Sequence, residues 1–166
     1  MNAPHATSLF DLRGRTALIT GSTRGIGLAL AQGLAESGAR VILNSRQQIA
    51  VEAAVAQLQA LGLDARGAAF DVADQASVEA AFADFDRTGL AVDILVNNAG
   101  IQHVARVENF PVERWDAIIA INLTSAFHAT RLALPAMKAA NWGRIINIAS
   151  IHGLVGSAEK SAYVAA

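Results

Sequence analysis

The chain has 166 residues, which is enough for one compact domain with a core. Its formal net charge of -1 and its 16% of charged residues leave neither a basic surface for nucleic acid nor an acidic tail, so we expect small-molecule partners or further copies of the chain. Cysteine is absent, and neither His103 nor His128 has a partner at ligand spacing, so we expect no catalytic metal. Because residues 1–15 are polar and no later run approaches about 20 apolar residues, we expect no signal peptide, no membrane span and a cytoplasmic location.

The apolar pattern alternates between short β-rich runs and longer helical stretches along the chain. It predicts strands over residues 16–20, 41–43, 68–70, 93–97 and 144–149, and helices over 26–37, 50–61, 77–85 and about 111–140. Five strands separated by helices predict an α/β fold with a doubly wound, Rossmann-type parallel sheet, as a single domain over residues 1–166. The last predicted strand is apolar on both faces and needs a further neighbour, so we expect the carboxyl-terminal strands of the natural domain to lie beyond Ala166.

A glycine-rich segment directly follows the first predicted strand and opens the first predicted helix. Glycine permits a tight turn and a close approach of the backbone to a pyrophosphate, and a helix amino terminus offers unpaired N–H groups. An ordinary glycine-rich turn is the alternative, but the position between a strand and a helix favours a dinucleotide site. The residues of this segment are Gly21, Ser22, Thr23, Arg24, Gly25, Ile26 and Gly27.

The second strand is followed by Ser45 and Arg46, with no carboxylate where an NAD-selective site places one. Arg46 and Arg24 could instead bind a 2′-phosphate, which favours NADP over NAD, unless both arginines are only solvated surface side chains. The carboxylate of Asp71 is placed to meet an adenine amino group. Further expected cofactor contacts follow the third and fourth strands, at the sheet edge where ligands bind in this architecture: Asp71, Val72, Asn98, Ala99 and Gly100.

Together with Asn122, Ser150 and Tyr163, the motifs at residues 20–27 and 97–100 resemble the short-chain dehydrogenase/reductase family. The resemblance runs from residue 14 to residue 166, whereas family members have roughly 250 residues. It implies an oxidoreductase that moves a hydride between a nicotinamide cofactor and a secondary alcohol or ketone, assembled as a homo-oligomer, a tetramer when complete. It also implies that Tyr163 is the general acid/base, that Ser150 bonds the reacting oxygen, and that Asn122 interrupts the long helix to hold a water.

The family's tyrosine is followed four positions later by a lysine, and the chain ends at Ala166 within this Tyr-x-x-x-Lys motif. We therefore expect little catalytic activity from the chain as it stands. A nucleotide-binding or assembly module without catalysis is the competing interpretation.

The segment around the family's serine and tyrosine resembles D-3-hydroxybutyrate dehydrogenases, in which residues matching Gln102, His152 and Lys160 bind the substrate carboxylate beside the serine and tyrosine. This resemblance implies a small hydroxy acid such as 3-hydroxybutyrate, for which cations and hydrogen-bond donors are suitable ligands. Residues 8–12 and 43–46 instead resemble gluconate 5-dehydrogenases, which favour NADP. A gluconate or polyol substrate therefore stays open, and so does the choice between NADP and NAD.

Overall fold

The computed structural model describes residues 10–166, so the first part of the gluconate-like segment at residues 8–12 lies outside the described residues. Five parallel strands form one sheet in the order β3-β2-β1-β4-β5. This order confirms the predicted doubly wound fold, in which the chain builds outward in both directions from β1. The strands are β1 (Thr16–Ile19), β2 (Arg40–Ser45), β3 (Ala65–Ala69), β4 (Ile94–Asn97) and β5 (Arg144–Asn147).

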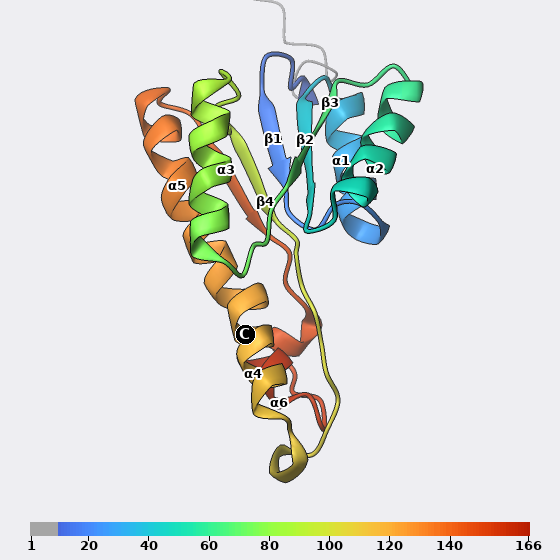
Figure 1. Ribbon diagram of the computed structural model, residues 1–166, viewed down its shortest axis with the longest axis vertical. Coiled ribbons are helices and arrows are strands. Elements are labelled where there is room, and N and C mark those ends of the chain that lie inside the picture. Colours follow the sequence, from blue (N-terminus) through green and yellow to red (C-terminus); the bar gives the residue numbers. More distant parts are fainter. Residues whose placement is uncertain (1–9) are drawn as a thin grey trace, which may run out of the picture.

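Helices cover both faces of the sheet (Figure 1). One face is covered by α1 (Gly25–Glu36) and α2 (Gln48–Ala60), and the other by α3 (Gln75–Arg87) and α5 (Ser125–Ala139). The central strands β1 and β4 are buried along their whole length because each of their faces meets a helix layer.

The edge strands differ most from the predicted ones. β3 spans Ala65–Ala69 rather than residues 68–70, because Arg66 and Gly67 lie at an exposed edge where no apolar pattern is needed. β5 ends at Asn147 rather than at residue 149, although the Ile148 amide still donates to the Asn97 carbonyl at 2.9 Å. β5 lies at the edge of the sheet, and its apolar residue Ile146 is 42% exposed because no further strand among residues 10–166 covers it.

The predicted long helix is one continuous helical stretch, made of α4 (Val112–Ile118), the π-helical turn η3 (Ile119–Thr124) and α5. Residues Val112–Ala139 are long and apolar enough to cross a membrane by length and composition, in contrast to the prediction that no run approaches a membrane span. The α5 part of this stretch packs against α3 and β4, and 22% of the apolar window is buried.

The amino ends of β1, β4 and β5 are tied together by polar side chains. The Asp93 carboxylate accepts a hydrogen bond from the Thr16 amide at 2.9 Å and from Arg15 at 3.3 Å. The Trp142 ring is flanked by the guanidinium of Arg15, 3.8 Å from its centroid, and by that of Arg144, 4.9 Å away. These contacts stabilise the end of the sheet that lies opposite the predicted site residues.

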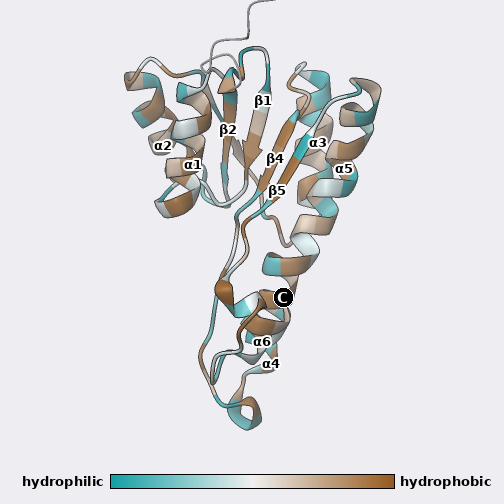
Figure 2. Ribbon diagram, turned by 180° about the vertical axis from the view of Figure 1, so that it is seen from behind, coloured by the Kyte–Doolittle hydropathy of each residue, from teal (hydrophilic) through white to brown (hydrophobic). Residues whose placement is uncertain are grey.

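Beyond the opposite, carboxyl ends of the strands, the chain forms a narrow extension (Figures 1 and 2). It contains α4 and three short elements, η2 (Val107–Asn109), η4 (Ile151–Gly153) and α6 (Ser161–Ala165). α6 packs against η3, η4 and α4. The extension therefore brings together segments that precede the long helix in the sequence and segments that follow it.

Candidate functional site

The glycine loop between β1 and α1 packs directly against the loop after β4. Gly21 has a φ of 62°, and a Cβ at this position would lie 2.9 Å from the Cα of Ala99. A Cβ on Gly27 would lie 2.6 Å from the Gly21 carbonyl oxygen, so the first turn of α1 can approach the loop only without a side chain. No side chain of Gly21 or Gly27 therefore covers the loop backbone at the amino end of α1.

A cleft of about 600 Å³ opens in front of this loop, at the carboxyl ends of β1 to β4. It is lined by every predicted cofactor residue except Ser22. Six further lining residues carry no sequence signal for a ligand, because they are uncharged and mostly apolar: Asn44, Gln47, Ala50, Phe70, Ile101 and Ile121. The four strand-end segments thus converge on one cleft, as the fold predicts.

Ser22, unlike the other predicted cofactor residues, does not line the cleft and instead packs beneath the loop. The residue has no exposed surface, and its hydroxyl donates to the Ile19 carbonyl at 2.6 Å. Its amide donates to the Asn44 carbonyl at 2.9 Å. Neither group is free to contact a ligand, since both are already hydrogen-bonded inside the protein.

Asn98 fastens the loop after β4 to the glycine loop. Its side-chain amide donates to the carbonyls of Thr20 at 2.9 Å and Gly21 at 3.1 Å. The Thr20 hydroxyl oxygen accepts the amides of Asn98 and Ala99, both at 3.0 Å. Asn98 and Thr20 together hold the two loops that form the middle of the cleft.

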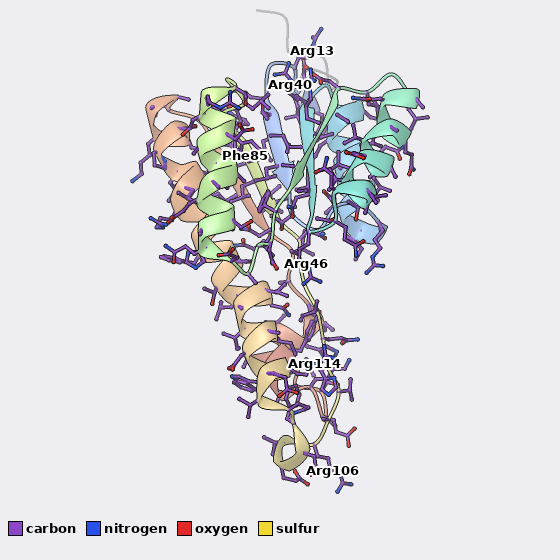
Figure 3. The ribbon with its side chains drawn as sticks, viewed as in Figure 1. Arg13, Arg40, Arg46, Phe85, Arg106 and Arg114 are labelled. Carbon is purple, nitrogen blue, oxygen red and sulfur yellow. The ribbon has the colours of Figure 1, made fainter. Side chains whose placement is uncertain are left out.

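Charged side chains border the end of the cleft formed by β2 and β3. Figure 3 shows Arg46 at the end of the sheet opposite Arg13 and Arg40. Its guanidinium lies 3.9 Å from the Asp71 carboxylate, and its side chain is 69% exposed. Arg24 is exposed at the start of α1 and has no carboxylate partner among residues 10–166. Two guanidiniums at one cleft are suitable donors for a phosphate.

Asn122 lies in the π-helical turn and binds the backbone that leaves the cleft. Its side-chain oxygen accepts from the Ile101 amide at 2.9 Å, and its side-chain nitrogen donates to the Ile101 carbonyl at 3.0 Å. The structure confirms that the long helix changes its geometry at this residue. Because Ile101 and Ile121 line the cleft, Asn122 sits at the junction between the cleft and the extension.

The remaining predicted side chains gather in the extension, from η4 and α6. The Ser150 hydroxyl accepts from the His152 amide at 3.2 Å. The Lys160 ammonium donates to His152 Nε2 at 3.3 Å, and His152 Nδ1 lies 3.3 Å from the Val155 carbonyl. The Tyr163 ring stands edge-on to the His152 ring, with centroids 6.1 Å apart. A serine, a tyrosine and two basic groups thus form one polar cluster next to η3.

Gln102 is exposed and takes no part in the hydrogen bonds of this cluster. In the described part of the chain, no three histidine or carboxylate side chains form a group that could hold a metal ion.

The parallel sheet, the bare glycine loop and the cleft at the strand ends define a Rossmann-type domain. The family model of the short chain dehydrogenases matches residues 15–166, and the chain belongs to this family.

Two curated relatives are named D-beta-hydroxybutyrate dehydrogenase. The protein from Cupriavidus necator is 59% identical over 157 residues, 93% of this chain and 60% of the relative. The protein from Rhizobium meliloti is 52% identical over 157 residues, 92% of this chain and 60% of the relative. The chain thus spans about 60% of the length of these relatives.

A solved structure, a gluconate 5-dehydrogenase from Burkholderia cenocepacia in complex with NADP and tartrate, superposes with a TM-score of 0.93. It is 42% identical to the chain and is matched over 97% of this chain and 63% of its own.

Proposed function

We propose that the chain is the cofactor-binding part of a nicotinamide-dependent oxidoreductase that interconverts a secondary alcohol and a ketone in the cytoplasm. The observation that carries this proposal is the cleft of about 600 Å³, which unites the glycine loop with the ends of β2, β3 and β4. This volume lies within the range of small-molecule and cofactor sites.

The residues of the cleft fit a dinucleotide. A side chain at Gly21 or Gly27 would clash with backbone, so the loop presents only its N–H groups and the amino end of α1 to an anion. Arg24 and Arg46 would bind a 2′-phosphate, and the carboxylate of Asp71 would meet the adenine. This donor set favours NADP over NAD, and NADP is the molecule bound to the Burkholderia cenocepacia relative.

Tyr163, Ser150 and Asn122 are the residues we assign to the chemistry. A nicotinamide held in the cleft would supply the hydride acceptor for the alcohol carbon and the hydride donor for the ketone. In the direction of ketone reduction, the Tyr163 hydroxyl would give its proton to the carbonyl oxygen as the C–H bond forms, which leaves a tyrosinate; in alcohol oxidation that tyrosinate would take the hydroxyl proton back as the C=O bond forms. Ser150 donates a hydrogen bond to the reacting oxygen. Asn122 holds the start of the extension against the cleft, and its proposed further role is to hold a water.

A small hydroxy acid such as 3-hydroxybutyrate is the substrate we favour. The Lys160 ammonium and the His152 imidazole lie beside Ser150 and Tyr163, which suits a carboxylate close to a hydroxyl carbon. The names of the two curated relatives from Cupriavidus necator and Rhizobium meliloti support this choice. Gln102 would be a third ligand once it turns toward the cluster.

Gluconate or another polyol is the second candidate, because the exposed Arg24 and Arg46 favour NADP, the cofactor seen in the gluconate 5-dehydrogenase structure. A nucleotide-binding module without catalysis is a third. We also propose a homo-oligomer, a tetramer for the whole protein, formed in part by the long helix. Phe127 on this helix is 63% exposed and Trp115 is 38% exposed.

Titration of the purified chain with NADPH and NADH, followed by nicotinamide fluorescence, tests the cofactor proposal. We expect saturable binding of both and tighter binding of NADPH; absence of any binding contradicts the proposal. Reduction of NAD or NADP by the whole protein with D-3-hydroxybutyrate or with gluconate then decides between the substrates. In that assay His152→Asn should impair turnover of hydroxybutyrate, and an equal turnover of hydroxybutyrate by the variant would exclude the carboxylate site.

A further inference from the structure

The side chain of Asn44 belongs to the wall of the cleft but carries no charge. It is 1% exposed at the end of β2, and it lines the cleft. Its side-chain oxygen accepts the Gly21 amide at 3.2 Å. Its side-chain nitrogen donates to the carbonyls of Ala68 and Phe70, both at 3.1 Å. The oxygen and the nitrogen of this buried carboxamide are therefore both hydrogen-bonded within the protein.

The backbone of Asn44 is bound to the same loop. Its amide donates to the Ser22 hydroxyl oxygen at 2.9 Å, and its carbonyl accepts the Ser22 amide at 2.9 Å. One residue thus makes three hydrogen bonds to the glycine loop and two to the end of β3. Because Asn44 is itself 1% exposed, these bonds hold their partners more firmly than they would in water.

The position of Asn44 connects the two halves of the cleft that must recognise one ligand. Arg46 follows it by two residues, and Asp71 directly follows Phe70, whose carbonyl Asn44 binds. A shift of the Asn44 carboxamide would therefore move the glycine loop relative to both charged side chains.

The chemistry at this position admits few other side chains. An aspartate carboxylate would turn an oxygen toward the two carbonyls that now accept the amide hydrogens, and like dipoles would repel. An aliphatic side chain would leave the Gly21 amide without this acceptor and would remove the side-chain hydrogen bonds to both carbonyls.

We propose that Asn44 is the positioning residue of the cleft, and that it sets the register between the phosphate-binding glycine loop and the groups that select the adenosine end of the cofactor. Asn44 accepts hydrogen bonds from the amides of both Gly21 and Ser22, so the loop's N–H donors to a phosphate lie after Ser22. This inference rests on the proposed cofactor site.

Asn44→Ala tests the proposal, with Leu58→Ala as the matched control. Leu58 is a fully buried residue of α2 and does not line the cleft, so its truncation destabilises the fold without touching the site. Affinities for NADPH and NADH are measured at a temperature where thermal scans show both variants folded. We expect Asn44→Ala to bind NADPH about tenfold or more weakly and to lose part of the preference for NADPH over NADH, whereas Leu58→Ala keeps both.

An Asn44→Ala variant with the affinities and preference of the unchanged chain overturns the proposal. If the unchanged chain itself binds neither dinucleotide, the proposed function fails, and that outcome is distinguishable because it precedes any substitution. If Asn44→Ala does not fold, amide hydrogen exchange of the unchanged chain decides. The Gly21 amide should then be strongly protected, and exchange as fast as that of Gly25 at the start of α1 refutes the bond to Asn44.

Discussion

Replacement of Arg46 by aspartate should convert the preference of the chain from NADPH toward NADH. The Arg46 guanidinium lies at the end of β2 on the border of the cleft, 3.9 Å from Asp71. A hydrogen bond to a charged group contributes about 1.5–3 kcal/mol, and the 69% exposure of this side chain places its contribution at the lower end of that range. NADPH affinity should therefore fall by about tenfold to thirtyfold.

The introduced carboxylate adds a second effect, because it stands near Asp71 and repels a 2′-phosphate but can accept hydrogen bonds from ribose hydroxyls. NADH affinity should stay level or rise slightly. Fluorescence titration with each cofactor measures both changes, and repetition at higher salt should shrink the loss of NADPH affinity, since partly exposed charges are screened.

Arg66→Asp is a matched control for this substitution. Arg66 is 61% exposed and also lies 3.9 Å from a carboxylate, that of Asp64, but it does not line the cleft. The control has the same change in net charge, and we expect it to leave both affinities unchanged. Equal effects of the two substitutions on NADPH, or none from Arg46→Asp, would refute the phosphate site at Arg46.

Gly27→Ala should destabilise the chain by about 1–3 kcal/mol and weaken NADPH binding, because the new Cβ would lie 2.6 Å from a backbone carbonyl of the loop; urea unfolding and titration measure the two effects. Asp93→Ala should lower the free energy of unfolding by about 1–3 kcal/mol, since it leaves a buried amide of β1 without its acceptor, and should leave NADPH affinity unchanged. Hydrogen bonds from Gln75 and then Arg131 hold the pKa of Glu79 below its ordinary value, so the stabilisation from this carboxylate is complete above the ordinary pKa and is lost as the pH falls through the lowered one. The stability difference between the unchanged chain and Glu79→Gln should accordingly vanish in acid, and a difference that persists at low pH contradicts the assignment.

The order of elements and the strand ends that form the cleft could be predicted from the sequence, because buried strands and amphipathic helices have distinct apolar periods. β3 could not be placed correctly, since an edge strand with Arg66 and Gly67 has little apolar pattern to detect. The π-helical turn was expected only through the resemblance at Asn122. Nothing in the local sequence distinguishes it from an ordinary helix.

Within the site, the glycines and charged residues were predictable because their type alone indicates a phosphate ligand. The roles of Ser22 and Asn44 were not, because both depend on hydrogen bonds between segments about 20 residues apart. A serine in a glycine loop suggests a ligand contact in sequence, and only the fold shows that its hydroxyl faces inward.

The contacts around Asp93 and Trp142 have a consequence for how such a chain can diversify. They anchor the strands at the end of the sheet remote from the cleft, with side chains that touch neither the glycine loop nor the polar cluster. Substitutions in the loops at the cleft end of the sheet can then alter which molecule is recognised, because the contacts at the opposite end still stabilise the fold. Libraries that vary residues 100–110 and 151–160 while the anchoring contacts are kept intact should therefore yield many folded proteins with altered ligand preference.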